Sequence, residues 1–157
     1  MINKFLKKNN PNRVIILGKT GFIASNLISL LKKNKIKFIS LSSKDINLLS
    51  QSSSNKLNNI IKKNDSLVFI SSIAPVKNYS MFLKNILMCK NFLNLKVLNN
   101  ISHFIYISSD AVYSDSKTLI SEKSKTDPDS LHGIMHITRE KLFKNYFKKN
   151  ISILRPT

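Results

Sequence analysis

The sequence contains few residues of the kinds on which several protein classes depend. It has one cysteine, Cys89, three glycines, no tryptophan and only 8 acidic residues in 157. A single cysteine excludes an internal disulfide framework and any zinc site built from several cysteines. No run approaches the ~18 consecutive apolar residues of a membrane span, and the basic residues 1–13 precede only a short apolar run, unlike a secretory signal. We therefore predict a cytoplasmic protein without a membrane partner.

The charge balance is strongly basic, with a net charge of +18 at pH 7. Clustered Lys and Arg would indicate nucleic-acid binding, because they release counterions from phosphates. Here the 23 lysines are scattered, only 3 arginines accompany them, and no aromatic residues interleave with them as a base-stacking surface requires. We expect these lysines to complement helix dipoles and to solvate the surface, so a nucleic-acid partner ranks third among the alternatives.

The arrangement of apolar residues, which make up 42% of the chain, indicates one globular domain of the α/β class. Short apolar runs alternate with longer segments of helical periodicity, which is typical of βαβ units around a parallel sheet. We predict strands at residues 13–17, 37–41, 66–71, 103–108 and 151–154, and helices at residues 22–33, 51–63, 79–98 and 133–149. The last helix should bury Ile137, Leu142, Phe143 and Tyr146. The predicted fold is a Rossmann-like three-layer αβα sandwich with a parallel sheet of about five strands.

The most specific segment is residues 14–24, VIILGKTGFIA, in which a buried strand leads through a glycine turn into an amphipathic helix. Gly18 would allow the tight turn, Gly21 would let backbone amides approach a pyrophosphate, and Ala24 would allow close helix–strand packing. The anion would lie at the helix N-terminus, where N–H groups are free. An ordinary turn with two glycines is the alternative. A nucleotide-triphosphate loop is excluded, because it needs a glycine at the position of Arg13.

This segment resembles the T-G-x-x-G-F-I-G fingerprint of the extended short-chain dehydrogenases, the NAD-dependent epimerase/dehydratase family that acts on nucleotide sugars. Further segments follow in the family's order. Residues 68–74, VFISSIA, resemble the strand that ends V-I-H-x-A-A, and residues 105–113, IYISSDAVY, resemble the S-S-x-x-V-Y-G strand end. Residues 153–157, ILRPT, resemble the strand after the family's catalytic helix. The resemblance implies an NAD(P)-binding Rossmann domain over residues 1–157, without the smaller C-terminal substrate domain of the family.

The resemblance also implies which residues contact a cofactor, NADP or NAD. Asp45 and Ile46 match the pair that holds the adenine ring, and Asn85 matches the asparagine of the family's N-V-x-G-T segment. The full set of expected cofactor residues is Gly18, Thr20, Gly21, Phe22, Ile23, Ser43, Lys44, Asp45, Ile46, Ile70, Ser71, Ser72 and Asn85. Where NAD-preferring epimerases carry a carboxylate, residues 41–44 read LSSK. Hydroxyls and an ammonium suit a 2′-phosphate better, so NADP is favoured unless Lys44 is simply another solvated lysine.

At the catalytic positions the resemblance is incomplete. Ser109 matches the family's catalytic Ser or Thr, but His132 and His136 occupy the positions of the tyrosine acid/base and of the lysine that assists it. His132 could carry the proton, because histidine titrates near neutral pH; the pair could bind a metal; or the chemistry is lost and only nucleotide binding remains. We expect no metal, because no third ligand is evident. Asp110 matches the first acid of the nucleotide-sugar dehydratases but Ala111 cannot serve as the second, which disfavours dehydration.

The sequence therefore predicts an NAD(P)-dependent sugar-nucleotide epimerase or reductase, more specifically its cofactor-binding portion. The alternative is a catalytically inactive Rossmann module that binds a dinucleotide. A nucleotide sugar would be the substrate of the complete enzyme, and a homodimer is left open. The sequence determines neither the sugar and its nucleotide nor the oligomeric state.

Overall fold

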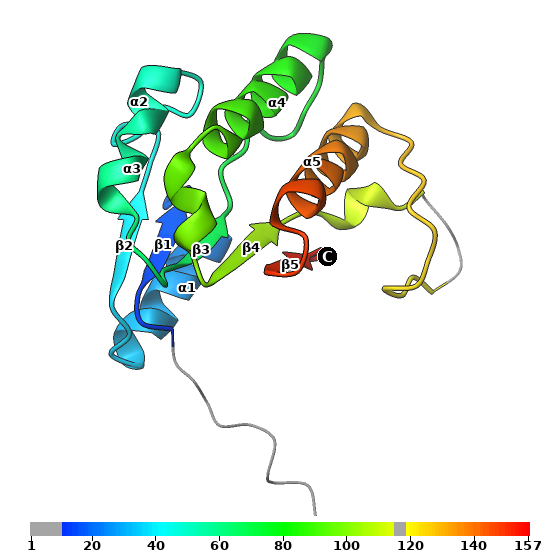
Figure 1. Cartoon of the computed structure of the whole chain (residues 1–157). Coiled ribbons are helices and arrows are strands. Elements are labelled where there is room, and N and C mark those ends of the chain that lie inside the picture. Colours follow the sequence, from blue (N-terminus) through cyan, green and yellow to red (C-terminus); the bar gives the residue numbers. More distant parts are fainter. Residues whose placement is uncertain (1–10, 115–118) are drawn as a thin grey trace, which may run out of the picture.

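In the computed structural model, which describes residues 11–114 and 119–157, five parallel strands form one sheet in the order β2-β1-β3-β4-β5 (Figure 1). The strands are β1 (Val14–Leu17), β2 (Phe38–Leu41), β3 (Ser66–Phe69), β4 (His103–Ile107) and β5 (Ile151–Leu154). The α-helices are α1 (Phe22–Lys33), α2 (Gln51–Asn55), α3 (Leu57–Ile60), α4 (Tyr79–Leu93) and α5 (Leu131–Phe147). Two 3-10 helices, η1 (Lys96–Asn100) and η2 (Asp110–Val112), flank β4. The predicted Rossmann-like α/β fold is thereby confirmed.

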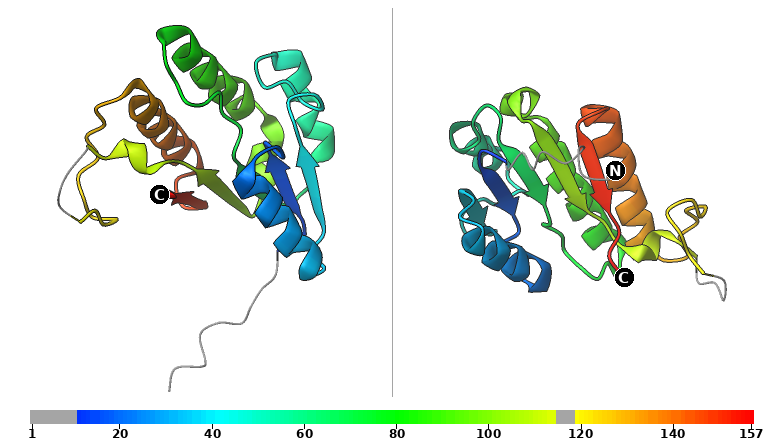
Figure 2. Two further views of the ribbon diagram at one scale, coloured as in Figure 1. Left: turned by 180° about the vertical axis from the view of Figure 1, so that it is seen from behind. Right: turned by 90° about the horizontal axis from the view of Figure 1, so that it is seen from below.

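Helices cover both faces of the sheet, as right-handed crossovers between parallel strands require (Figure 2). Helix α1 packs on one face, to which β1 contributes Val14 and Ile16. Because successive strand residues point to opposite faces, β1 contributes Ile15 and Leu17 to the other face. There α4 and α5 cover the larger core, whose centre is a group of aromatic rings in mutual contact: Phe69, Phe92, Phe104, Tyr106 and Phe143. None of the helices in the described segments is both long and apolar enough to span a membrane.

Element boundaries differ from the prediction where polar residues act on the backbone. The predicted helix 51–63 is two short helices, because Ser50 caps α2 and the serines after it hydrogen-bond locally, which competes with a longer helix. The predicted helix 79–98 ends early and continues as η1. Helix α5 begins two residues earlier than predicted, at Leu131, because the Ser130 side chain accepts a hydrogen bond from the backbone N–H three residues on.

The buried face of α5 differs from the predicted one. Of the four side chains expected there, Phe143 is 0% exposed, but Leu142 is 37% exposed and the other two are only partly buried. The residues that α5 does bury are Gly133, Met135, His136, Arg139, Glu140 and Phe143. Helical periodicity of apolar residues could not show this, because polar side chains become buried only where partners from other elements satisfy them.

Helix α5 approaches η2 closely through Gly133. A Cβ on Gly133 would overlap the carbonyl oxygen of Ala111, so only glycine fits at this position. This contact places the first turn of α5, with His132, beside the end of β4, with Ser109. Two of the three predicted catalytic residues therefore share one region at the carboxyl ends of the strands.

Candidate functional site

The turn between β1 and α1 is built on two glycines in the left-handed region. Gly18 has φ 102° and Gly21 has φ 121°, conformations that residues with a side chain rarely adopt. A Cβ on Gly18 would lie 2.7 Å from the backbone nitrogen of Ser71, so the turn packs directly on the chain after β3. A Cβ on Gly21 would meet no atom of the described residues within 4 Å. Gly18 therefore serves the fold, whereas the space at Gly21 is open to a ligand.

The N-terminus of α1 has free backbone donors. Among the described residues no side chain caps this helix at Gly21, and its first turn contains no acidic residue. Phe22 and Ile23 are exposed at this end, whereas Ala24 is 1% exposed where the helix packs on the sheet. Free N–H groups and the helix dipole attract an anion. The turn and the helix end therefore have free donors and open space where the sequence predicts a pyrophosphate.

At the end of β2, Asp45 is held by an ion pair and a turn. Its Oδ2 atom lies 2.9 Å from the Lys19 ammonium and accepts hydrogen bonds from the backbone N–H and the hydroxyl of Ser42, at 2.8 and 2.7 Å. The Lys19 hydrogen bond, followed by those from Ser42, holds the pKa of the Asp45 carboxyl well below its usual range. Through Lys19 and Ser42, Asp45 thus connects the glycine turn with the end of β2. These two segments flank the expected adenosine site.

The chain after β3 passes against the glycine turn. The backbone N–H groups of Ile70 and Ser71 donate to the Leu17 carbonyl at 2.9 and 3.0 Å. Asn85 of α4 is 0% exposed, and its amide pairs with both the N–H and the carbonyl of Ile73 at 3.0 Å. Asn85 therefore fixes the backbone of the segment after β3 from the protein interior. This buried position differs from the direct cofactor contact that the resemblance implied.

The remaining predicted cofactor residues differ in exposure. Ile46 is 4% exposed and belongs to the hydrophobic core. The exposed members are Thr20, Ser43, Lys44 and Ser72. The structure thus brings the glycine turn and the ends of β2 and β3 together at one edge of the sheet, while the side chains of Ile46 and Asn85 point into the interior.

Ser109 follows β4 and begins η2. Its hydroxyl accepts a hydrogen bond from the Ala111 N–H at 3.1 Å and donates to the Asp110 carboxylate at 3.0 Å. Ser109 is partly exposed and Asp110 is exposed. Asp110 therefore competes with any ligand oxygen for the Ser109 proton.

His132 and His136 lie one turn apart on α5, with their rings edge to face and 4.7 Å between centroids. The Nδ1 atom of His132 accepts a hydrogen bond from the Val76 N–H at 3.4 Å, which places the proton of the neutral ring on Nε2. The Nδ1 atom of His136 lies 2.8 Å from the Tyr106 hydroxyl, and this side chain is only 5% exposed. The two rings are therefore adjacent, but His136 lies deeper.

Both histidines are neutral at pH 7. Burial lowers the pKa of His132 below its ordinary value of 6.5, although the Asp110 carboxylate opposes this. The pKa of His136 falls to about 3, chiefly because of burial and then because of the Arg139 cation and His132. A catalytic His132 would thus titrate at lower pH than its residue type predicts. No group of three or more potential metal ligands gathers within residues 11–114 and 119–157.

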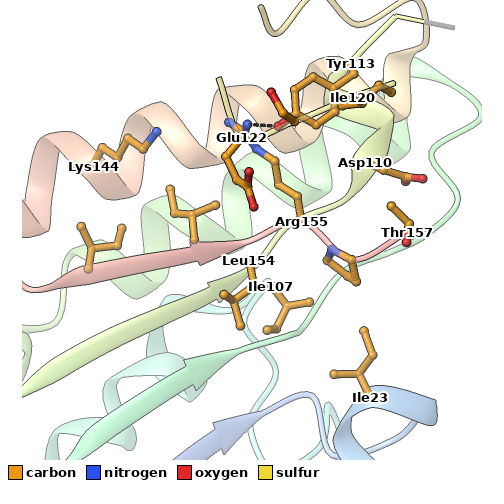
Figure 3. A pocket seen from close by; sticks show the side chains of 14 residues that line it. Ile23, Ile107, Asp110, Tyr113, Ile120, Glu122, Lys144, Leu154, Arg155 and Thr157 are labelled. Atoms are coloured by element: carbon orange, nitrogen blue, oxygen red, sulfur yellow. Dashed lines mark hydrogen bonds between the residues drawn. The ribbon is translucent and has the colours of Figure 1, made fainter. Parts of the chain in front are cut away.

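A cavity of about 860 Å³ lies at the ends of β4 and β5 (Figure 3). It is lined by Ile23 from α1, by Asp110 and Tyr113 from the chain after β4, and by Arg155 and Thr157 from the chain after β5. The two α5 histidines are not among the described residues that line it. The cavity therefore joins the N-terminus of α1 to the region of Ser109 without reaching the histidine pair.

A buried ion pair beside this cavity was not predicted from the sequence. Arg155 donates from Nε and Nη2 to the two carboxylate oxygens of Glu140, at 2.8 and 2.7 Å. It also donates from Nη1 to the Tyr113 hydroxyl at 2.7 Å (Figure 3). Glu140 is 0% exposed and also accepts from the Ser108 hydroxyl at 2.7 Å. Both charged residues stand in segments that resemble the family, but only the fold shows that their side chains meet.

The comparison with protein families agrees with this geometry. The model of the NAD-dependent epimerase/dehydratase family matches residues 14–157. The chain belongs to the NAD-dependent epimerase/dehydratase family. The family is described as NAD-dependent, in agreement with the predicted cofactor, NADP or NAD. No curated protein sequence matches this epimerase/dehydratase chain.

Solved structures of epimerases and reductases share its fold. A UDP-N-acetylglucosamine 4-epimerase from Bacillus cereus has a TM-score of 0.77 at 23% identity, over 91% of this chain and 59% of that one. A dTDP-4-dehydrorhamnose reductase from Bacillus anthracis in complex with NADP has a TM-score of 0.77 at 19% identity, over 92% and 52%. A UDP-glucose 4-epimerase from Thermus thermophilus in complex with NAD has a TM-score of 0.79 at 16% identity, over 91% and 54%. This epimerase/dehydratase-family chain spans little more than half the length of these proteins.

Proposed function

We propose that this chain is the NAD(P)-binding portion of a cytoplasmic sugar-nucleotide epimerase or reductase. The observation that carries the proposal is the open N-terminus of α1 at Gly21, at the same edge of the sheet as Ser109 and His132. A dinucleotide with its pyrophosphate at α1 would extend across the ends of β3 and β4 towards these two residues. Residues 1–157 would form the Rossmann domain, and further chain or a partner chain would supply most of the sugar site.

Titration of the purified chain with NADH and NADPH tests this proposal. We expect saturable binding of one dinucleotide per chain, measured by isothermal titration calorimetry. The absence of binding of either cofactor at millimolar concentration would contradict the proposal, because the site assigned to the pyrophosphate would then hold none.

NADP is the cofactor we favour, because two lysines flank the expected position of its 2′-phosphate. Lys44 is exposed after β2. Lys19 lies 2.9 Å from Asp45 and neutralises the carboxylate that would otherwise repel a phosphate there. Both lysines therefore favour the phosphorylated cofactor over NAD.

Replacing Lys19 with methionine is expected to weaken NADPH binding about tenfold, or about 1.4 kcal/mol, and NADH binding by less than about twofold. Without the ammonium, the Asp45 carboxylate faces the 2′-phosphate unscreened. Calorimetric titration with both reduced cofactors measures the two effects. Lys32→Met removes a lysine from the far end of α1 and should change neither affinity. Equal losses for both cofactors, or tighter binding of NADH by the parent chain, would contradict the NADP preference.

In the proposed reaction the nicotinamide exchanges a hydride with a carbon of the sugar. Ser109 and His132 act on the oxygen attached to that carbon. Once the Ser109 hydroxyl gives up its hydrogen bond to the Asp110 carboxylate, it donates to this sugar oxygen and orients it. In the ligand-free chain the Val76 N–H donates to Nδ1 of His132, so Nε2 carries the proton of the neutral ring. To accept the proton of the sugar hydroxyl at Nε2, His132 moves its own proton to Nδ1 and gives up the Val76 hydrogen bond. His136, the third predicted member, would donate to the ribose next to the nicotinamide.

His132→Phe is expected to lower turnover of the assembled enzyme about 100-fold or more. Because burial lowers the pKa of His132 below 6.5, activity that needs the neutral ring rises with pH through an apparent pKa below 6.5 and stays flat above it. The variant should lack this acidic limb in a plot of kcat against pH. His103→Gln, at the opposite end of β4, is the control and should retain the parent profile.

The second candidate is a catalytically inactive module that binds a dinucleotide. One observation favours it: His136 stands at the lysine position of the family, and its buried, neutral ring is bonded to Tyr106. Such a ring carries no charge to lower the pKa of an acid/base beside it. Both candidates predict cofactor binding, but only the first predicts that His132→Phe lowers turnover. A rate and pH profile unchanged in that variant would show that His132 is no catalyst, and the absence of turnover by the assembled parent enzyme would leave only the second candidate.

For the assembly we propose a homodimer through apolar side chains on the outer surface of α4 and α5, which pack side by side. The exposed members of this surface are Tyr79, Leu83, Leu87, Leu131, Ile134 and Leu142. Monomeric proteins rarely expose apolar patches larger than a few hundred Å², and stable interfaces bury about 800 Å² per partner. A second copy would cover this surface with the same set of side chains.

Leu83→Glu is expected to convert the dimer into a monomer, because a carboxylate would be desolvated within the interface. Size-exclusion chromatography with light scattering measures the mass. Leu30→Glu makes the same change at an exposed leucine of α1, 57% exposed and outside this surface, and should leave the dimer intact. A parent chain that is monomeric at high salt, where the repulsion between two basic chains is screened, would contradict the homodimer.

A further inference from the structure

Arg139 of α5 is a fully buried arginine to which the proposed reaction assigns no role. Its side chain is 0% exposed, and among the described residues no carboxylate lies within ion-pair distance of it. The guanidinium donates to the Ser71 carbonyl at 2.8 Å and to the Cys89 sulfur at 3.1 Å. It also lies against the ring of Tyr106, 5.3 Å from the ring centroid. Arg139 therefore puts a permanent positive charge beneath the ends of β3 and β4.

Tyr106 connects this charge to His136. The phenol is 1% exposed, and its hydroxyl oxygen lies 2.8 Å from Nδ1 of His136. Burial raises the pKa of Tyr106 far above its usual range, so the phenol keeps its proton. The Arg139 cation attracts the phenol oxygen and repels its proton, which orients the O–H towards Nδ1. Nδ1 of His136 therefore accepts, and the proton of the neutral ring lies on Nε2.

The second ring nitrogen of His136, Nε2, is the one that Tyr106 leaves to a ligand. Within the described residues no hydrogen-bond partner occupies this atom. His136 is 5% exposed, and its ring centroid lies 4.7 Å from that of His132. An oxygen of a ligand bound beside His132 can therefore reach this N–H group.

We propose that Arg139 and Tyr106 are positioning residues that fix His136 as a neutral ring, whose Nε2–H is a permanent hydrogen-bond donor to a ligand oxygen. The identification of that oxygen as a ribose or sugar hydroxyl rests on the function proposed above. The positive charge that the family's lysine would bring to position 136 is carried instead by Arg139, one helical turn further along α5. His136 thus supplies the hydrogen-bond donor and Arg139 the positive charge, whereas the family's lysine supplies both.

The surroundings of His136 keep its ring neutral over a wide pH range. The titratable and charged groups nearest to it are Tyr106 of β4, Cys89 of α4, and His132, Arg139 and Glu140 of α5. Asp110 of η2, which packs against α5, acts on the His132 side of the pair. Tyr106 and Cys89 stay protonated, because burial raises the pKa of both. Glu140 is paired with Arg155. Burial, and then the Arg139 cation and His132, lower the pKa of His136 to about 3, so the ring is neutral from roughly pH 4 upward.

Nitrogen-15 NMR of the histidine rings in the ligand-free chain tests this proposal. We expect His136 to show the Nε2–H tautomer and no titration between about pH 5 and 8. Tyr106→Phe keeps the aromatic ring over which Arg139 lies but removes the O–H, so the His136 signals should shift towards a mixture of tautomers. Arg139→Met removes the cation and should raise the pKa of His136 by about one unit or more.

Tyr113→Phe is the matched control, since it removes a phenol O–H that is bonded to Arg155 instead of His136; it should leave the His136 signals unchanged. A His136 that titrates between about pH 5 and 8 in the parent chain, or that carries its proton on Nδ1, would overturn the proposal. So would an unchanged tautomer in Tyr106→Phe. Because these signals are read without ligand, a failure to bind NAD(P)H overturns the proposed function and leaves this test in force.

Discussion

The Gly21→Asp variant will fold and will bind neither NADH nor NADPH. A Cβ at position 21 meets no described atom within 4 Å, so we expect the main cost to the fold to be that of φ 121° for a residue with a side chain, about 1–2 kcal/mol. The new carboxylate, however, lies at the free N-terminus of α1, where the pyrophosphate would bind. We expect affinity to fall at least ~100-fold, or about 2.7 kcal/mol, measured by calorimetric titration alongside thermal unfolding.

Two further variants separate the ligand effect from changes in charge and backbone. Ser29→Asp adds the same charge at an exposed position in the middle of α1 and should bind the cofactor as the parent chain does. Gly18→Ala should instead destabilise the fold, because its Cβ would lie 2.7 Å from the backbone nitrogen of Ser71. A folded Gly21→Asp chain with parental affinity for NADPH would show that the pyrophosphate binds elsewhere.

Arg155→Met is expected to destabilise the chain by about 3–5 kcal/mol, a large part of the ~5–15 kcal/mol by which a domain of this size is stable. The Glu140 side chain is 1% exposed and that of Arg155 is 19% exposed. Removing the arginine therefore leaves a buried carboxylate whose remaining close partner is the Ser108 hydroxyl. Urea unfolding followed by circular dichroism measures the loss.

A double-mutant cycle tests whether this cost arises from the pair. In the Glu140→Gln background, Arg155→Met should cost much less, because a neutral amide needs no counter-ion. Lys144→Met removes a second cation, 57% exposed and 3.9 Å from the Glu140 carboxylate, and should cost less than about 0.5 kcal/mol. An equal cost of Arg155→Met with and without the Glu140 carboxylate would mean that the ion pair does not stabilise the fold.

The order of helices and strands follows from local patterns, and so does the glycine turn. The predicted bounds of α1 and β5, residues 22–33 and 151–154, are the observed ones. Strands buried on both faces read as short apolar runs, and an amphipathic helix shows its period within a dozen residues. Likewise, the need for glycine at Gly18 and Gly21 is a property of two backbone positions with positive φ. None of these features depends on residues distant in the chain.

The predicted site is only partly reproduced by the structure, because several side chains have partners that sequence patterns do not reveal. Asp45 is paired with Lys19 across 26 residues, and Asn85 pairs with the backbone of Ile73. The histidines share a helix face as their spacing predicts, but the neutral state of His136 depends on burial against Tyr106. A pattern of residue types predicts proximity along a helix and cannot predict desolvation.

The sequence by itself determined the α/β fold, the family and the glycine turn, since each depends on residues close together in the chain. Only the tertiary structure decided which charged side chains are buried and what they contact. Arg139 donates to the carbonyl of Ser71, 68 residues away, and Glu140 accepts from Arg155, 15 residues away. In the sequence these residues look like the solvated positions of a surface helix. A charge is buried only where other elements of the fold supply its partners, and those partners come together only when the sheet and its helices assemble.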